Sequence, residues 1–126
     1  MRPQPLITVR DVEASSRWYR ELLGAQSQHG GPAYDRLTSD GETILQLHHW
    51  DAKEHPEIGE PDSTQPGRGV ILWFATTDLD EDIARARRLG VDFIAERRFN
   101  PQARQQESWI CDPDGYTVVI SGPGAA

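Results

Sequence analysis

Two residues of this chain combine chemically active side chains with places in predicted strands. His48 lies near the end of one alternating stretch, and Glu107 lies inside a second. An imidazole and a carboxylate together suit the ligation of zinc or iron, and each can also transfer a proton. Both residues have structural alternatives. A histidine beside His49 at a strand end is typical of partial exposure. The glutamate could equally be a buried acid held by backbone donors or by an arginine such as Arg36 or Arg104.

Other catalytic signatures are absent from the sequence. There is no glycine-rich phosphate loop, no Gly-x-Ser-x-Gly nucleophile motif and no His-Glu-x-x-His helix. Cys111 is the single cysteine, and no base stands beside it in sequence to activate its thiol, so it is predicted to be inert. The acidic run at 78–82 is interpreted as a helix cap followed by first-turn charges that favour the helix dipole, and not as a metal site.

Length and composition limit the function classes. The chain has 126 residues, about one domain, and its 37% hydrophobic content is enough for one core. Its 13 basic and 20 acidic residues give a net charge of −7, which argues against duplex nucleic acid or an anionic membrane as a partner. The sequence contains no apolar run of about 18 residues, so no membrane span is predicted. The absence of a secretory leader and of any possible internal disulfide makes a cytoplasmic location the expectation.

The elements that would hold the candidate residues repeat along the chain. Each half begins with a strand, continues with a capped helix and ends in a hairpin that turns at an Asp-Gly pair. The first half is predicted to contain a strand at 5–9, a helix at 12–23 between Asp11 and Gly24, and strands at 34–37 and 43–49 around Asp40-Gly41. The second is predicted to contain a strand at 69–76, a helix at 79–89 between Asp78 and Gly90, and strands at 91–96, 105–111 and 116–121, with a turn at Asp114-Gly115. The order is interpreted as strand, helix and three strands, twice, although in the first half only two of the three strands after the helix are assigned residues.

This repeat predicts an α+β fold of two tandem βαβββ modules. A four-stranded sheet with a helix on one face leaves its other face apolar, and two curved sheets can hide these faces by enclosing a cleft. The chain is predicted to be one domain, 1–126, with modules at about 4–50 and 68–122. The stretch at about 51–67 is interpreted as a surface linker, either without function or acting as a lid. The uncovered faces also predict a homodimer.

Short motifs at matching places in the two halves carry a family resemblance. The most specific is Asp-Pro-Asp-Gly-Tyr at 112–116. From Pro5 to about Gly122 the chain resembles the superfamily of glyoxalases, bleomycin-resistance proteins and ring-cleaving dioxygenases, also called vicinal oxygen chelate proteins. That superfamily hosts several chemistries and also pure binders, so the resemblance implies the fold and leaves the reaction open. The other stretches that carry it are 9–15, 18–19, 23–24, 78–80 and 89–91.

The resemblance also implies where a metal would be held. In metal-dependent members, four strand positions supply His, Glu or Gln ligands to a divalent ion. By spacing from the Asp turns, these positions fall here at Gln4, Gln46, Ile71 and Val119. Isoleucine and valine cannot ligate a cation, and two neutral amides are too few donors for zinc, nickel or iron. No cofactor is therefore expected. A divalent metal at a relocated site formed by His48 and Glu107 is the alternative.

With Gln46, Ile71 and Val119 facing the cleft, strand alternation decides what else lines it. The helix side is expected to receive Leu45, Leu47, Val70, Leu72, Phe74 and Ile110. The candidate ligand-binding residues are Gln4, Gln46, His48, Trp73, Glu107 and Trp109. Two indoles among aliphatic side chains and a few polar groups suit a planar or heteroaromatic ligand. The two tryptophans could equally fill the core without a ligand.

Glu107 lies five residues before Asp112, where bleomycin-resistance-type proteins carry a glutamate, and this likeness favours the binding branch of the superfamily. The predicted function is metal-free sequestration of an aromatic or antibiotic-like small molecule, and a charged Glu107 would favour a cationic one. The alternative is an enzyme of the glyoxalase, thiol transferase, isomerase or dioxygenase type with His48 and Glu107 as catalytic candidates. A fold with a vestigial pocket is the third interpretation.

Overall fold

The computed structural model describes residues 2–50, 67 and 70–123. The chain divides into two compact units, Met1–Pro66 and Gly67–Ala126, and each is described by itself. The predicted linker at about 51–67 lies outside the described residues, except for Gly67.

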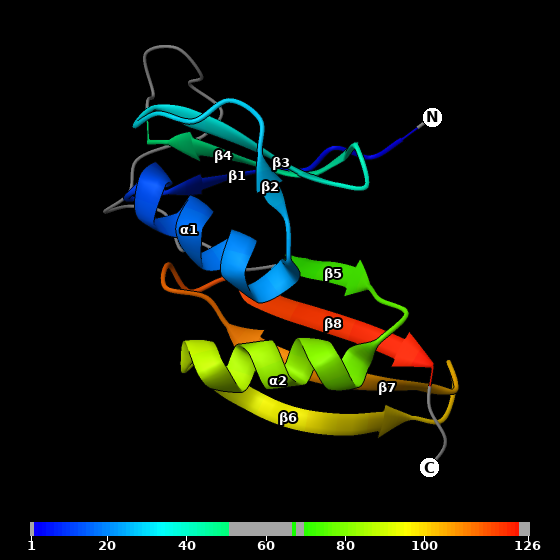
Figure 1. The fold of residues 1–126 in the computed structure, drawn as a ribbon. Helices are drawn as coiled ribbons and strands as arrows, with labels where there is room; N and C mark the ends of the chain where they lie inside the picture. Colours follow the sequence, from blue (N-terminus) through cyan, green and yellow to red (C-terminus); the bar gives the residue numbers. More distant parts are fainter. Residues whose placement is uncertain (1, 51–66, 68–69, 124–126) are drawn as a thin grey trace. The chain divides into compact units, whose positions relative to one another are not determined.

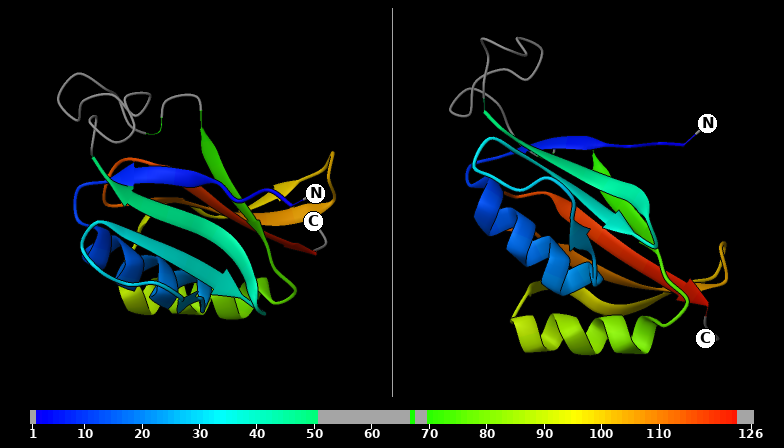
Figure 2. Two further views of the ribbon diagram at one scale, coloured as in Figure 1. Left: turned by 90° about the horizontal axis from the view of Figure 1, so that it is seen from above. Right: turned by 45° about the horizontal axis from the view of Figure 1, so that its top comes forward.

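The first unit contains one four-stranded sheet with a helix along one face (Figures 1 and 2). The strand order is β1-β4-β3-β2, in which β1 runs parallel to β4 and the other pairs are antiparallel. The elements are β1 (Leu6–Val9), α1 (Val12–Leu23), β2 (Gln26–Ser27), β3 (Tyr34–Ser39) and β4 (Glu42–His49).

Local signals in the sequence determine both ends of α1. The Asp11 side chain accepts a hydrogen bond from the Ala14 N–H at 3.0 Å, which satisfies one of the unpaired donors of the first turn. Gly24 ends the helix with a φ of 67°, a left-handed conformation that glycine adopts without steric cost. The apolar face of the helix then packs on β3 and β4. The fully buried core residues of these three elements include Tyr19, Leu22, Leu37, Leu45 and Leu47.

The second unit repeats this arrangement. Its sheet has the order β5-β8-β7-β6, with β5 parallel to β8, and α2 lies along one face (Figure 1). The core on that face includes Leu72, Ile110, Val118 and Ile120 from the sheet and Leu79, Ile83 and Ala86 from the helix. Neither helix of the described residues is long and apolar enough to cross a membrane. The elements are β5 (Ile71–Ala75), α2 (Leu79–Leu89), β6 (Asp92–Asn100), β7 (Gln105–Cys111) and β8 (Thr117–Pro123).

The predicted fold class is confirmed: the protein is α+β, with two βαβββ modules whose sheets are curved. The bounds of several other strands shift by one or two residues, and three larger details differ from the expectation. Gln26–Ser27 forms the short strand β2, and a stretch of two polar residues is too short to show the alternation that predicts a strand. Strand β6 continues to Asn100 instead of ending near 96. Val70 is 44% exposed and precedes β5, so it does not pack on the helix side as expected.

Candidate functional site

The face of the second sheet that points away from α2 carries the aromatic candidates in register. Residues directly opposite each other on neighbouring strands share a face of the sheet. Trp73 of β5 pairs with Val119 of β8, which pairs in turn with Trp109 of β7. The next row on the same face joins Ala75, Ser121 and Glu107. The register therefore places Trp73, Trp109 and Glu107 on one surface, which we call the tryptophan face.

Each indole of the tryptophan face is held by a hydrogen bond. The two rings meet edge to face, with centroids 6.0 Å apart and an angle of 85°. The Trp73 Nε1–H donates to Ser121 Oγ at 2.9 Å, and the Trp109 Nε1–H donates to Glu107 Oε1 at 2.9 Å. Trp73 nevertheless keeps 48% of its surface exposed. A large apolar side chain that is oriented and still exposed can receive a flat ligand without first being ordered.

Glu107 is 2% exposed, and both of its oxygens accept hydrogen bonds. Oε1 accepts from Trp109, and Oε2 accepts from Asn100 Nδ2 at 2.9 Å. Asn100 is itself oriented, because its Oδ1 accepts from the N–H groups of Gln102 at 3.1 Å and Ala103 at 3.3 Å. The alternative that Glu107 is a buried acid is therefore confirmed, but the partners expected for it, backbone donors or an arginine, are wrong. A side-chain amide and an indole hold it, and Asn100 lies on a strand segment that the sequence pattern did not predict.

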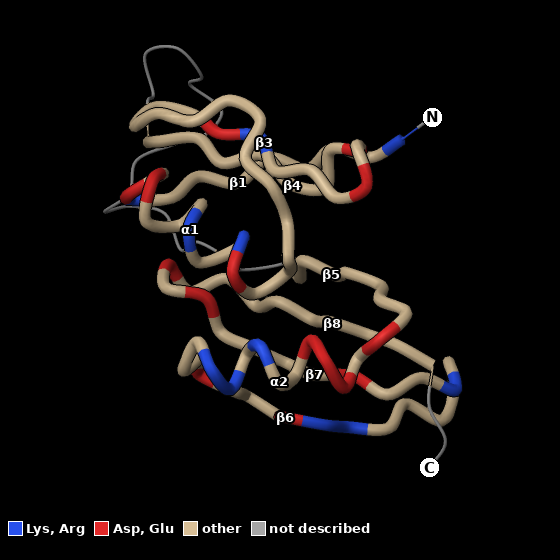
Figure 3. The backbone as a smooth tube through the Cα atoms, in the orientation of Figure 1, with Lys and Arg blue, Asp and Glu red and all other residues tan. Residues whose placement is uncertain are grey.

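Arg98 of β6 lies directly opposite Glu107 in the register of β6 and β7. Its guanidinium carbon is 4.8 Å from the centroid of the Trp109 ring, a distance at which cation–π attraction acts. The side chain is exposed. Figure 3 shows the positive charge that gathers along this part of β6. The tryptophan face thus joins two indoles, a buried carboxylate and an exposed cation.

In the first unit, Gln46 has the corresponding place on the sheet face that points away from α1. The hydroxyl of Tyr34 donates to its Oε1 at 2.6 Å, and its Nε2 donates to the carbonyl oxygen of Gln4 at 2.9 Å. The carbonyl of Gln4 therefore takes part in this contact, while the residue as a whole is exposed. Gln46 acts here as a link between β3 and the segment before β1.

His48 is 5% exposed, so the expected partial exposure at the strand end is wrong. Its Nδ1 lies 2.6 Å from the carbonyl oxygen of His49. A carbonyl can only accept a hydrogen bond, so Nδ1 carries the proton and donates in the neutral ring, which leaves Nε2 as the acceptor. Tyr34 packs nearby, with its ring centroid 6.3 Å from that of His48. His48 and Glu107 belong to different units.

The four positions at which the family resemblance places metal ligands do not suit a metal in this chain. Their spacing is consistent in both units: Gln46 pairs with Leu6, two residues after Gln4, and Val119 pairs with Trp73, two residues after Ile71. Ile71 and Val119 have no donor atom, and both amide atoms of Gln46 are already engaged. Among the described residues, no group of three or more His, Cys, Asp or Glu side chains is arranged to hold a metal ion.

A buried carboxylate that the sequence interpretation missed is Asp35 on β3, which is 2% exposed. Burial of this carboxylate opposes ionisation. Hydrogen bonds outweigh that effect and hold the pKa of Asp35 below its ordinary value of 3.8. The donors are the hydroxyls of Ser16 (2.6 Å) and Ser27 (2.8 Å) and the N–H groups of Gly30 (2.8 Å) and Arg36 (2.8 Å). Asp35 thus ties α1, β2 and the loop before β3 together, which indicates a structural role.

Cys111 lies at the end of β7 on the tryptophan face. Burial, followed by the negative charges of Asp92 and Asp112, raises the pKa of its thiol. The thiol is therefore protonated near neutral pH and is a poor nucleophile. This agrees with the prediction that Cys111 is inert.

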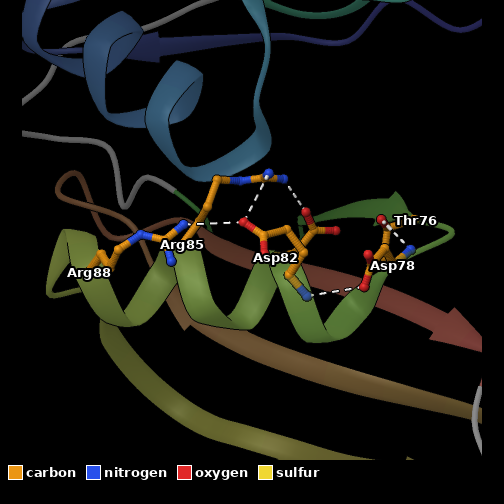
Figure 4. A network of polar contacts seen from close by, with 6 residues as sticks. Thr76, Asp78, Asp82, Arg85 and Arg88 are labelled. Carbon is orange, nitrogen blue, oxygen red and sulfur yellow. Dashed lines mark hydrogen bonds and ion pairs between the residues drawn. The ribbon is translucent and has the colours of Figure 1, made fainter.

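The acidic run at the start of α2 serves the helix, as the sequence predicts (Figure 4). The Asp78 side chain accepts from the Glu81 N–H at 3.1 Å and caps the helix. Asp82 forms an ion pair with Arg85, and Arg88 donates to Glu81 at 3.2 Å. The acidic residues of the first turn and the basic residues of the last turn also interact favourably with the helix dipole.

An open hollow of about 390 Å³ lies beside the start of α2. The charges of Arg97 and Asp80 at this hollow are paired, at 2.6 Å. None of the candidate ligand-binding residues lines it. Its lining residues are Thr77, Asp78, Leu79, Asp80, Arg97, Gln106 and Pro123.

Comparison with known proteins gives a family match over almost the whole chain. The family model of the Glyoxalase/Bleomycin resistance protein/Dioxygenase superfamily matches residues 3–120. No curated protein matches the sequence at a significant level.

Solved structures at low sequence identity share the fold. A glyoxalase/bleomycin resistance protein/dioxygenase family enzyme from Burkholderia phytofirmans PsJN is 18% identical, with a TM-score of 0.77, over 94% of this chain and 96% of that one. TioX from Micromonospora sp. ML1 is 14% identical, with a TM-score of 0.71, over 97% and 98% of the two chains. The fosfomycin resistance protein FosX from Listeria monocytogenes, complexed with Mn(II) and sulfate, is 14% identical, with a TM-score of 0.72, over 98% and 90%.

Proposed function

The chain belongs to the Glyoxalase/Bleomycin resistance protein/Dioxygenase superfamily, and on this premise we propose that it is a small-molecule-binding protein that sequesters a planar aromatic or antibiotic-like ligand without a metal. The superfamily includes both enzymes and binding proteins, so membership alone does not distinguish the two. The proposal therefore rests on the side chains of this chain. The tryptophan face is the observation that carries the proposal.

The tryptophan face supports binding because its aromatic surface is both oriented and accessible. Trp73 is half exposed, and its indole N–H is already satisfied by Ser121. A ligand that covers this ring removes apolar surface from water and leaves no donor unpaired. Sequestration of a compound lowers its free concentration, and no reaction step is required.

The catalytic alternative, an enzyme that uses His48 and Glu107, receives no support from the geometry. Both oxygens of Glu107 accept hydrogen bonds from side chains of the same sheet, and Nδ1 of His48 donates to the neighbouring carbonyl. His48 and Glu107 also belong to different units of the chain. The homodimer and the cytoplasmic location are further proposals that rest on the sequence.

We expect the purified protein to contain no stoichiometric transition metal, because two of the four family ligand positions hold aliphatic side chains. Elemental analysis after purification without chelators checks this expectation. Added zinc or manganese should also leave the thermal unfolding midpoint unchanged, since a specifically bound ion would raise it. About one zinc, nickel, iron or manganese ion per chain would overturn the metal-free proposal and favour the enzyme.

Replacing Trp73 with alanine should weaken the binding of a planar aromatic ligand by about 1–3 kcal/mol, through lost contact area. The measurement is a thermal-shift panel of planar aromatic compounds on the wild type, followed by calorimetric titration of the compounds that stabilise it. Trp18→Phe, which removes an indole from α1 and not from the tryptophan face, is the matched control and should bind as the wild type does. If no aromatic compound stabilises the wild type, the tryptophans only fill space and the binding proposal fails.

A further inference from the structure

We infer that the ligand of the tryptophan face is a planar aromatic acid, whose anionic group pairs with Arg98 while its ring covers Trp73. This inference rests on the proposed binding function and specifies its ligand class. The Arg98 guanidinium carbon is 4.8 Å from the Trp109 centroid, which is itself 6.0 Å from the Trp73 centroid. One small ligand can therefore contact the guanidinium and the exposed indole together.

The negative charge of the tryptophan face is not available to a ligand. Glu107 is 2% exposed, and its two oxygens accept from Trp109 and Asn100. Because the carboxylate is almost fully buried, a cationic ligand could reach it only by moving side chains that pack on it, which costs free energy. The geometry thus gives no support to the cationic ligand that the sequence suggested.

The positive charge of this face, by contrast, is accessible. Arg98 is exposed, and within the part of the chain that the structure describes its guanidinium makes a ring contact but no hydrogen bond or ion pair. A guanidinium offers five N–H donors in a planar fork that matches a carboxylate. Stacking on Trp109 holds the group beside the site, so less rotamer freedom is lost when an anion binds.

Two irregularities in β6 bring Arg98 to this place. The register between β6 and β7 shifts between Phe93 and Ala95 and again between Ala95 and Arg98. Regular pairing from Asp92 opposite Cys111 would have put Glu96 opposite Glu107, two like charges side by side. The two shifts put Arg98 there instead. Glu96 forms an ion pair with Arg87 of α2.

The other charged residue in register on the tryptophan face lies at its opposite end. Asp92 of β6 is opposite Cys111, which pairs with Thr117 of β8, and Thr117 pairs with Ile71 of β5. This row and the row of Arg98 lie on opposite sides of the tryptophan row. A ligand with one acidic group is therefore oriented, with that group toward Arg98 and away from Asp92.

The test compares 1-naphthoate with 1-naphthamide, which has the same rings and no charge, by calorimetric titration of the full-length protein. Wild type should bind the acid about tenfold more tightly, as expected for a hydrogen bond to a charged group. Arg98→Gln should abolish this preference, because it weakens the binding of the acid much more than the binding of the amide. Arg97→Gln removes the same charge from the adjacent residue, which pairs with Asp80 beside α2, and should preserve the preference.

Any other outcome would overturn a specific part of the inference. Equal affinities of the wild type for the acid and the amide would overturn the ligand class and leave the binding function standing. A preference for the acid that survives Arg98→Gln, or that disappears equally in Arg97→Gln, would overturn the role of Arg98. If the wild type binds neither compound and no aromatic compound stabilises it, the proposed function fails together with the inference.

Discussion

Replacing Asp35 with asparagine should lower the free energy of unfolding by about 2–4 kcal/mol, the largest effect expected from a conservative change in this chain. The carboxylate accepts from two serine hydroxyls and from backbone N–H groups. An amide keeps one oxygen as an acceptor and turns an NH₂ group, which only donates, toward the remaining donors, so hydrogen bonds to residue 35 are lost.

The same residue should give the protein an acid-sensitive stability. The folded-state pKa of Asp35 lies below its ordinary value, so its contribution to stability is complete above that value and is lost as the pH falls through the lower folded-state pKa. Urea unfolding from pH 6 to pH 2 measures both effects. The variant should show a flatter loss of stability across the acidic range than the wild type.

Asp40→Asn is the matched control, because Asp40 is exposed in the β3–β4 turn, where asparagine also tolerates its φ of 51°. It should change the free energy of unfolding by less than about 0.5 kcal/mol. An Asp35→Asn protein with wild-type stability at pH 6 would show that the carboxylate does not hold these segments together.

Glu107→Gln should destabilise the protein by about 1–3 kcal/mol and disturb the tryptophan face. The carboxylate offers an acceptor to Trp109 and another to Asn100, whereas glutamine offers one acceptor and one NH₂ group. Asn100 cannot rotate its amide to compensate, because its Oδ1 accepts from two backbone N–H groups. One buried donor is left without a partner. Chemical unfolding measures the loss, and a shift in tryptophan emission reports the altered environment of Trp109.

Glu21→Gln, an exposed position on α1, makes the same chemical change without a buried partner and should stay within about 0.5 kcal/mol of the wild type. Unchanged stability and emission in Glu107→Gln would show that the carboxylate does not orient the indole. That result would favour the alternative in which Glu107 is a catalytic residue.

Much of the fold could be predicted because it rests on local rules. Helix α1 begins at Asp11 and ends at Gly24 as predicted, since an N-cap side chain and a left-handed glycine act within a few residues of the helix ends. The Asp40-Gly41 pair turns the chain with positive φ at both residues, the geometry that a two-residue hairpin needs. Alternation also predicted that Leu72 faces the helix while Ile71 and Trp73 lie on the opposite face, and in the structure Leu72 is buried while the other two are exposed.

The candidate site could be predicted only in part. Alternation put Trp73, Trp109 and Glu107 on one sheet face, and their register agrees with this. It could not supply the partners of Glu107, because Asn100 belongs to the end of a strand whose length depends on pairing with β7. The prediction that His48 is partly exposed, which rested on its place at a strand end, was also wrong, since burial depends on neighbours distant in sequence.

The sequence by itself determined where the two helices begin and end, which side chains of a regular strand share a face, and that two ligand positions of the family hold Ile71 and Val119. Only the tertiary structure decided which charge stands beside the tryptophans. The register shifts in β6 place Arg98 opposite Glu107, and the donors to Asp35 come from α1, β2 and the following loop. Alternation has a period of two residues and can be recognised within a single strand. A β-bulge, or a buried carboxylate with all its hydrogen bonds, depends on partner residues that only folding brings together.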